Sequence, residues 1–364
     1  MAPQGVVGYS LVHATVRALY ADLLSARMWD RLIAAQDHDA VLALLSTTAY
    51  GPHLAIERSL LTPRRAVYQI RWRLAEVYER LIGMLRLTQP VACQLMQTLW
   101  QNFEVNNLKA ALRGTETRAS WDQVRHLLYP MSRYISLTAE VLEQIVHATD
   151  MARAIELVQH TPYYDTLRYA LHRYQDERNL FPLEVALDLG SRRRLWASIA
   201  QLSGRDREMA LQVVGLALDV DNLLWAIRYR VYSHLSEEEI INYTLPLGYQ
   251  VKDEHIRAIA AEADIAQVVR RAFPQLPEIA GLSPLSGKGL TSLEQQLQYH
   301  IIRTCQHMFI GYPFHLGIPL AYVLLHEYEI RDLTVLIEAK FSRLKPQAFT
   351  SLLNLQPLLP GRQN

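Results

Sequence analysis

The chain has few of the residues that mark secreted, turn-rich or nucleic-acid-binding proteins. Only two cysteines, Cys93 and Cys305, occur in 364 residues, which predicts a reducing compartment and no disulfide framework. Lysine and arginine number 37 against 36 aspartates and glutamates, and no run of more than three basic residues occurs. This balance argues against nucleic-acid or anionic-lipid binding by electrostatics alone. Glycine is scarce at 15 residues, as expected of helices rather than turn-rich sheet.

Signals for membrane insertion or export are also missing. Residues 1–5 lack a basic stretch followed by an apolar core, so we expect no signal peptide. The longest apolar run, residues 316–325, contains Pro319 and is much shorter than the roughly 18 residues of a membrane span. The sequence therefore predicts a soluble cytoplasmic protein with no direct membrane span.

A phosphate-binding loop is not present in full. Residues 287–289 read Gly-Lys-Gly, but Gly281 is one residue too early for the P-loop pattern, and Gly289 takes the place of its Ser or Thr. Residues 274–288 form the one stretch rich in proline, glycine and serine. We expect an exposed loop there.

One His-Asp pair could bind a metal. His38 and Asp39, with His13 upstream as a further ligand, resemble the pairs that helical metal-dependent phosphohydrolases use. However, Asp39 also suits the cap of a short helix over residues 41–45, and a single dipeptide does not define a metal site. A metal-dependent hydrolase is the weakest of the functional hypotheses.

A second group of possible ligands lies near the C-terminus. Cys305 and His307 are close in sequence to His300 and His315, but these spacings match no common zinc pattern. Core and surface positions explain them better. We expect no cofactor, no metal and no catalytic residue, and thus a protein that is not an enzyme.

What the sequence does contain is one motif written three times, at residues 103–113, 218–228 and 328–338. Each copy has a large apolar residue, an acid, a β-branched residue, a polar residue, Asn or Asp, and then Leu. The acids that head the copies lie 115 and 110 residues apart. Agreement in register over so many positions argues against three unrelated amphipathic helices.

The local pattern predicts that each copy starts a helix. With the acid as N-cap, the preceding apolar residue and the following Leu would form a hydrophobic staple, as in Phe103 with Leu108. We therefore interpret the polar positions of the motif mainly as structural, serving caps and bonds between helices of this chain. These positions are Glu104, Asn107, Arg113, Asp219, Asn222, Arg228, Glu329 and Asp332.

The repeat also divides the chain. Its spacing predicts three helical units of common domain size, residues 1–131, 132–248 and 249–364. Ser120 can cap a short helix after the first motif copy, a capping box at Ser236 opens one after the second, and a further box is expected at Thr291. No segment shows the period-two alternation of a strand, so the predicted fold class is all-α.

Four blocks of the sequence together resemble the family of C subunits of V/A-type rotary ATPases, which is related to the d subunit of the eukaryotic V-ATPase. They are residues 8–19, the repeated helix, residues 235–248 and residues 319–333, of which the last is the most specific. They follow one another in the family's order. His13 and Thr15 stand where the family usually has Asn and Arg, and Glu338 where it often has Arg.

The resemblance implies a funnel of three V-shaped helical units around a pseudo-threefold axis, with a central cavity. It implies a non-catalytic central-stalk subunit on the cytoplasmic face of the membrane, a socket that joins the proteolipid rotor ring to the central shaft during ion transport. Among charges that would face the cavity, Arg17 and Arg331 are our expected partner contacts. A generic helical-repeat scaffold is the alternative, although solenoid repeats are typically only ~20–45 residues long.

Overall fold

A computed structural model describes residues 4–57, 61–276 and 287–355. Every regular element in these ranges is a helix, which confirms the all-α prediction. The α-helices are α1 (Gln4–Ala21), α2 (Ala26–Ala34), α3 (His38–Leu45), α4 (Pro63–Thr88), α5 (Pro90–Thr117), α6 (Trp121–Arg125), α7 (Ala139–Val146), α8 (Met151–Glu156), α9 (Tyr164–Glu177), α10 (Phe181–Gln201), α11 (Gly204–Ala210), α12 (Leu216–Arg228), α13 (Glu237–Asn242), α14 (Asp253–Ala260), α15 (Ile265–Ala272), α16 (Gly287–His307), α17 (Gly317–Phe341) and α18 (Pro346–Phe349).

The chain packs as two compact units. Unit 1 comprises residues 1–191 together with 322–364, and unit 2 comprises residues 192–321. The C-terminal part of α17 therefore belongs to the same unit as the first helices of the chain. The three-unit division at residues 131 and 248 stays a prediction.

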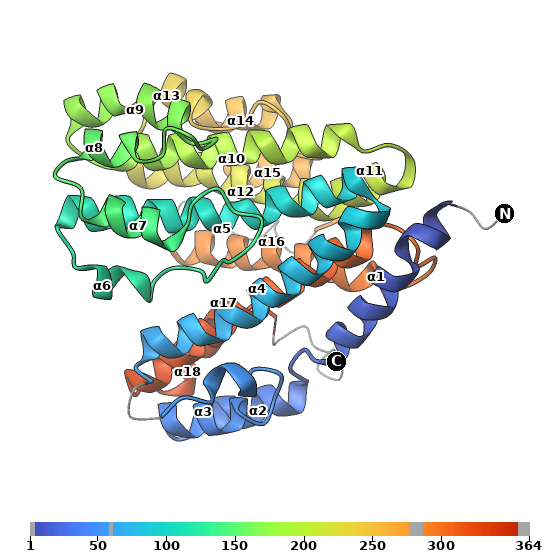
Figure 1. Cartoon of the computed structure of the whole chain (residues 1–364). Helices are drawn as coiled ribbons and strands as arrows, with labels where there is room; N and C mark the ends of the chain where they lie inside the picture. Colours follow the sequence, from blue (N-terminus) through green and yellow to red (C-terminus); the bar gives the residue numbers. More distant parts are fainter. Residues whose placement is uncertain (1–3, 58–60, 277–286, 356–364) are drawn as a thin grey trace. The chain divides into compact units, whose positions relative to one another are not determined.

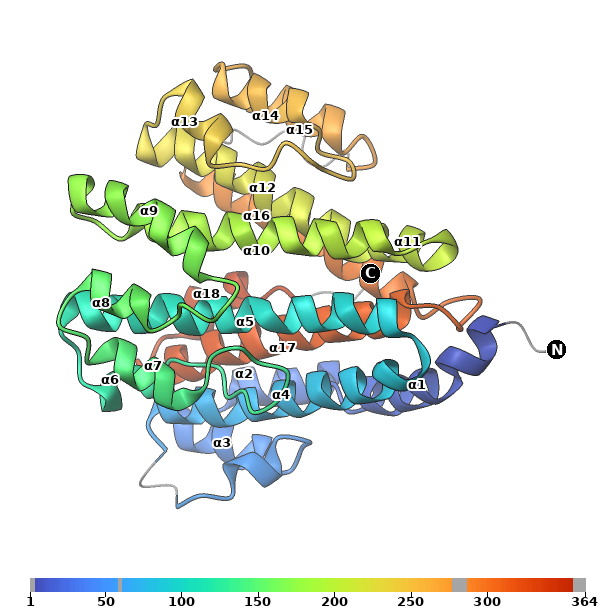
Figure 2. The same cartoon turned by 45° about the horizontal axis from the view of Figure 1, so that its top comes forward.

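Unit 1 is built on the long helices α4 and α5, which pack against each other (Figures 1 and 2). Thr62 caps α4 and Pro63 occupies its first turn, where the missing N–H of proline costs nothing. Pro90 starts α5 in the same way. The rings of Tyr78 and Trp100 stack between the two helices with centroids 5.0 Å apart.

Unit 2 is built on one continuous helical stretch, residues 204–233. It consists of α11, a π-helical turn at Leu211–Gly215, α12 and a second π-helical turn at Tyr229–Ser233. Helices α14 and α16 pack against α12, and α13, α14 and α15 follow one another along the chain in contact.

A pair of short helices recurs three times: α2–α3, α7–α8 and α14–α15. The N-caps of the first helix of each pair are Ser25, Thr138 and Lys252, spaced by 113 and 114 residues. The N-caps of the second helix are Asp37, Asp150 and Asp264, with the same spacings, and each aspartate accepts a backbone N–H of its helix. The recurrence is thus visible in local structure as well as in sequence.

Two of the predicted N-caps are confirmed, and those at Asp39 and Thr291 are wrong. Ser120 and Ser236 cap α6 and α13 with full capping boxes. However, α16 already runs through Thr291 from Gly287, and the cap of α3 is Asp37, because the helix begins one residue before Asp39. The expected loop at residues 274–288 falls largely on residues 277–286, outside the described residues.

The motif acids are not N-caps either. Glu104 lies in the middle of α5 and Glu329 in the middle of α17, while Asp219 lies inside the stretch 204–233. The predicted staples therefore do not form as helix starts. Phe103 packs instead against Tyr129, with ring centroids 4.6 Å apart.

Candidate functional site

The three motif acids are almost completely buried, and each lies in the interior of a helix. Glu104, Asp219 and Glu329 are each 1% exposed. A carboxylate in such a place is costly unless hydrogen bonds replace its water shell. Each of the three acids has such hydrogen bonds, and they all reach other segments of the chain.

Glu104 on α5 binds the segment that leads into α7. Its Oε1 accepts the backbone N–H groups of Ser136 and Leu137, both at 2.5 Å. Its Oε2 accepts the hydroxyl of Tyr163 at 2.5 Å, just beyond α8. One carboxylate thus holds both ends of the α7–α8 pair.

Glu329 on α17 makes the same contacts to the α2–α3 pair. Its Oε2 accepts the backbone N–H of Leu24 at 2.7 Å, directly before the α2 cap. Its Oε1 accepts the hydroxyl of Tyr50 at 2.7 Å, just beyond α3. Tyr50 and Tyr163 occupy corresponding positions, 113 residues apart.

Asp219, whose side chain is shorter, binds the segment that leads into α14. Its two oxygens accept the backbone N–H groups of Tyr249 and Val251, both at 2.9 Å, and that of Gln250. In this copy three backbone N–H groups bind the carboxylate, whereas Glu104 and Glu329 each bind a tyrosine hydroxyl.

The polar residue three positions after each acid binds a second segment. Asn107 donates to Tyr129 O at 2.9 Å and accepts Tyr129 N–H at 2.7 Å. Asn222 does the same with Leu245, at 2.9 and 2.8 Å. Asp332 accepts two backbone N–H groups, from residues 354 and 355, at 2.9 and 2.8 Å. These segments follow α6, α13 and α18.

The residue eleven positions after each acid also binds the pair of short helices that the acid holds. Thr115 donates to Ile145 O at 2.6 Å, at the C-terminal end of α7. Lys340 donates to Ile33 O at 2.7 Å and Ala35 O at 2.6 Å, at the end of α2. The sequence prediction missed this position, although all three copies carry a hydrogen-bond donor there.

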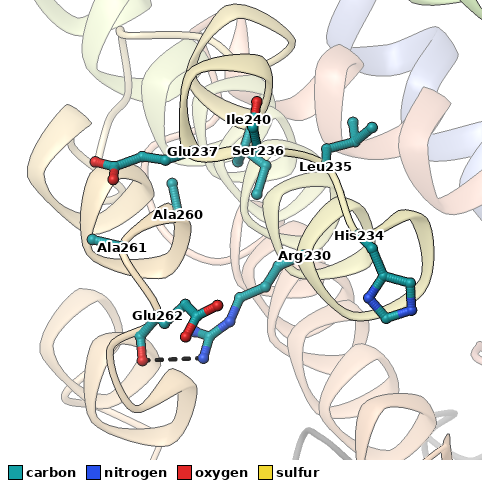
Figure 3. Close-up of a pocket in the computed structure, with 9 residues that line it drawn as sticks. All are labelled: Arg230, His234, Leu235, Ser236, Glu237, Ile240, Ala260, Ala261 and Glu262. Atoms are coloured by element: carbon teal, nitrogen blue, oxygen red, sulfur yellow. Dashed lines mark hydrogen bonds between the residues drawn. The ribbon is translucent and has the colours of Figure 1, made fainter.

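In the second copy this position is Arg230, which binds the C-terminal end of α14. Its guanidinium donates to Ile259 O at 3.2 Å, Ala263 O at 2.7 Å and Glu262 O at 3.1 Å. The bond to Glu262 is drawn in Figure 3. The Arg230 side chain also lines a pocket of about 460 Å³ together with His234 and Glu237. Three hydrogen bonds of the guanidinium thus go to carbonyls at and beyond the C-terminal end of α14.

Each motif helix therefore holds a neighbouring helix at both ends. The acid lies at the N-terminal end of the held helix, where unpaired N–H groups favour negative charge, and the donor lies at the C-terminal end, where unpaired carbonyls favour donors. We call this arrangement the two-ended clamp. It consists of Glu104 with Thr115, Asp219 with Arg230, and Glu329 with Lys340.

Burial dominates the titration of two of the acids. Loss of water raises the pKa of Glu329 to about 7, against the opposing effect of the Tyr50 and Leu24 hydrogen bonds. It likewise raises the pKa of Asp219 to about 6, although three backbone N–H groups lower it. The hydrogen bonds therefore offset only part of the cost of burying these two carboxylates.

The arginine nine residues after the acid in the first two copies forms an ion pair with another long helix. Arg113 forms a two-fold contact with Glu184 of α10, at 2.5 and 2.9 Å, and Arg228 pairs with Glu294 of α16 at 2.7 Å. Glu338 is exposed at the third position. The arginines are about half exposed, so water and salt weaken these pairs.

The two expected partner contacts lie on the surface. Arg17 of α1 is exposed and donates from Nε to His13 Nε2 at 3.2 Å. Arg331 of α17 is exposed and stacks over the ring of Tyr328, 5.2 Å from its centroid. Their role toward a partner stays a prediction.

The residues of the metal hypothesis serve other contacts. His38 Nδ1 lies 3.6 Å from Asp39 Oδ1, and its ring meets that of Phe341 edge-on at 5.9 Å. Within residues 4–57, 61–276 and 287–355, no three His, Cys, Asp or Glu side chains are grouped as a metal site would need. Cys93 and Cys305 are both buried, and neither forms a disulfide within the described residues.

One part of the described chain, residues 204–233, is a helix long and apolar enough to cross a bilayer by composition. However, 72% of its apolar window is buried inside the structure. The core helix of a folded unit has the same composition.

Together these contacts define an all-helical protein whose buried polar residues join its own helices. The sequence matches the family model described as "ATP synthase (C/AC39) subunit" over residues 12–351. The C subunit of the A-type ATP synthase of Methanocaldococcus jannaschii is 22% identical, over 95% of this chain and 86% of that protein. The corresponding protein of Methanosarcina mazei is also 22% identical, over 94% and 92%, and that of a Desulfurococcus species 23%, over 94% and 90%.

The chain belongs to the ATP synthase (C/AC39) subunit family. The resemblance expected from the four sequence blocks is thereby confirmed, and it covers nearly the whole described chain.

Proposed function

We propose that the chain is the non-catalytic central-stalk socket of a V/A-type rotary ATP synthase, joining the proteolipid rotor ring to the central shaft. The observation that carries the proposal is the family match over residues 12–351, which spans both compact units. Torque between ring and shaft must pass through this part without loss. The protein would sit on the cytoplasmic face of the membrane through its contact with the ring.

The two-ended clamps suit a subunit that must transmit torque. A helix held only by apolar contacts can slide, because dispersion and burial have little directional preference. Directional hydrogen bonds at both ends of α2, α7 and α14 fix the position of each helix along its neighbour. Rigid elements with fixed register transmit a twist instead of absorbing it.

We further propose three related units, at residues 1–131, 132–248 and 249–364, around a pseudo-threefold axis with a central cavity. The repeated N-caps at intervals of 113 and 114 residues support this arrangement. So do the three clamps, each with the same offset of eleven residues between acid and donor. A generic scaffold of short stacked repeats would not need units of this size.

Co-purification tests the proposal. The tagged full-length chain is expressed in cells that carry such a motor, the membranes are extracted with a mild detergent, and the bound proteins are identified by mass spectrometry. We expect both the ring proteolipid and the shaft subunits in stable ratio to the chain. Recovery of neither would overturn the proposal and favour the scaffold alternative.

A charge reversal tests the expected interface. The double variant Arg17→Glu with Arg331→Glu should recover several-fold less ring or shaft protein, because both side chains are exposed. Arg153→Glu, an exposed arginine on α8 of the same unit, is the matched control and should recover as much as the parent chain. Equal recovery with all variants would exclude this interface and leave the family role intact.

A further inference from the structure

The contact between α4 and α17 in unit 1 repeats the contact between α5 and the first half of α10. The Ser191 hydroxyl of α10 donates to Asn102 Oδ1 of α5, and the Tyr78 hydroxyl of α4 donates to Glu327 Oε1 of α17 at 2.5 Å. Asn102 and Glu327 each lie two residues before the motif acid of their helix. In both views α4 lies beside α17 (Figures 1 and 2). The two helix pairs can therefore be compared position by position.

The α5–α10 pair also carries an ion pair. Arg113 lies eleven residues after Asn102 on α5, and Glu184 lies seven residues before Ser191 on α10. Nε and Nη2 of the Arg113 guanidinium donate to the two carboxylate oxygens of Glu184, at 2.5 and 2.9 Å. The two helices are thus joined at one point by a hydroxyl and at another by a side-on contact between a guanidinium and a carboxylate.

The same steps along α17 and α4 lead to a second pair of opposite charges. Glu338 lies eleven residues after Glu327, and Arg71 lies seven residues before Tyr78. Each residue advances an α-helix by the same rise of about 1.5 Å, so two helix pairs in the same register place equivalent residues opposite each other. Here the carboxylate is on the motif helix and the guanidinium on the other helix. The charges are reversed relative to the α5–α10 pair.

The Arg71 guanidinium has a buried nitrogen that lacks an acceptor. Its Nη1 donates to Leu127 O at 2.6 Å and to Leu128 O at 3.2 Å, and the group lies 4.2 Å from the centroid of the Tyr129 ring. Within the described residues, Arg71 Nε is buried without a hydrogen-bond partner. A buried donor without an acceptor destabilises the fold. Nε and Nη2 form the edge that binds the carboxylate in the α5–α10 pair.

Glu338 can supply the acceptor. Its side chain is exposed and, in the part of the chain that the structure describes, makes no hydrogen bond or ion pair. We propose that Arg71 and Glu338 form the third ion pair between long helices, with reversed charges, and that this reversal directs α17 to α4. Rotation about the side-chain bonds of Glu338 brings its carboxylate to Nε and Nη2 of Arg71, while Nη1 keeps both carbonyls.

The reversal distinguishes α17 from the other two motif helices. The arginines at the corresponding position of the first two copies each pair with a glutamate, Glu184 or Glu294. Glu338 would meet a like charge on either glutamate, and either arginine would meet a like charge at Arg71. Like-charge contacts disfavour wrong partners. In a chain whose three motif helices are otherwise alike, the reversed pair therefore selects the correct neighbour for the last one.

A double-mutant cycle on the full-length chain tests the pair. Arg71→Glu and Glu338→Arg each place like charges opposite each other, and the two changes together restore opposite charges. The unfolding equilibrium constant of the double variant, from urea titrations, should be roughly 3- to 10-fold smaller than the two single effects multiplied together predict. Loss of the carbonyl bonds of Arg71 cancels in the cycle. Single effects that simply multiply would overturn the pair.

Two further cycles are the controls. Arg113→Glu with Glu184→Arg should show coupling of the same sign, because these side chains are in contact. Arg71→Glu with Arg331→Glu should show none, since Arg331 lies seven residues before Glu338, roughly 10 Å along the helix. Coupling to Arg331 as large as to Glu338 would reveal a general effect of charge and would also overturn the pair.

Refolding tests the role of the reversal. The double variant Arg71→Glu with Glu338→Arg keeps opposite charges, but its third motif helix now carries the same charge as the first two. Arg71→Gln with Glu338→Gln loses the same carbonyl bonds without gaining an attraction to a wrong helix, and is the matched control. After dilution from urea, the charge-swapped variant should return less native monomer in size-exclusion chromatography than the neutral one. An equal or higher yield would overturn the role of the reversal in directing α17.

Discussion

Tyr50 and Glu329 are 279 residues apart in sequence and share a buried hydrogen bond of 2.7 Å. The same pairing joins Tyr163 to Glu104 within the interior of the chain. The repeated motif thus forms the same contact twice, once between segments close in sequence and once between segments 279 residues apart. The third copy reaches the same result with Asp219 and three backbone N–H groups.

The first prediction concerns the pH dependence of stability. The pKa of Glu329 is raised in the folded chain to about 7 from 4.5, so its contribution to stability is present at low pH and is lost as pH rises through this window. The loss amounts to roughly 3 kcal/mol at most. Glu329→Gln cannot titrate, so the change in urea-unfolding free energy between pH 5 and 8 should shrink by a comparable amount. An unaltered pH profile in this variant would contradict the assignment.

Asp219 offers a test of the clamp in unit 2. Asp219→Ala leaves three backbone N–H groups without an acceptor in a buried place, and should cost about 3 kcal/mol or more. Asp221→Ala is the control, because this nearby aspartate pairs with Arg192 while 46% exposed and should cost about 1 kcal/mol or less. Thermal unfolding of the two variants side by side measures the difference. Similar melting temperatures would show that the clamp stabilises little.

Thr115 tests the donor position that the sequence pattern had not suggested. Thr115→Val keeps the shape of the side chain but removes the donor to Ile145 O, and should cost about 1–3 kcal/mol because a buried carbonyl loses its partner. Thr117→Val, two residues on, removes an exposed hydroxyl that bonds only within its own helix. That control should unfold within about 0.5 kcal/mol of the parent in denaturant titrations. Equal effects would mean that the offset of eleven residues has no structural role.

The ion pair at the ninth position should matter less. Arg113→Ala breaks the contact with Glu184, but the arginine side chain is 58% exposed, so the expected loss is about 1 kcal/mol or less and should diminish at high salt. Urea titrations at two salt concentrations measure it. A large loss that is independent of salt would show that this pair, and not the clamp, fixes the helices.

The sequence predicted the helical class, the register of the repeat and two of the caps, because these depend on local patterns. It misplaced the acids at helix starts. Phe103, Glu104 and Leu108 satisfy the staple pattern, but Pro90 begins a helix that continues through them without a break. A local pattern cannot distinguish a helix start from a helix interior when both place the same residues on the same face.

The partners of the acids required long-range information. Residues 44–50 and 157–163 correspond at a shift of 113 residues, and each segment ends in one of the two tyrosines that bind Glu329 and Glu104. That Tyr50 pairs with the last motif copy, and not with the nearest one, follows only from the packing of the chain ends. The sequence pattern did not reveal the donor eleven residues after each acid, because Thr115, Arg230 and Lys340 share a function but not a residue type.

The most direct test of the proposed role is ATP-driven ion transport in inverted membrane vesicles. The vesicles come from cells whose gene for this chain has been deleted, with and without the chain restored, and ATP hydrolysis is measured in parallel. We predict that pumping is lost without the chain and returns with it, while the hydrolytic capacity of the catalytic subunits persists. Full ion pumping in the absence of the chain would contradict its role as the link between shaft and ring.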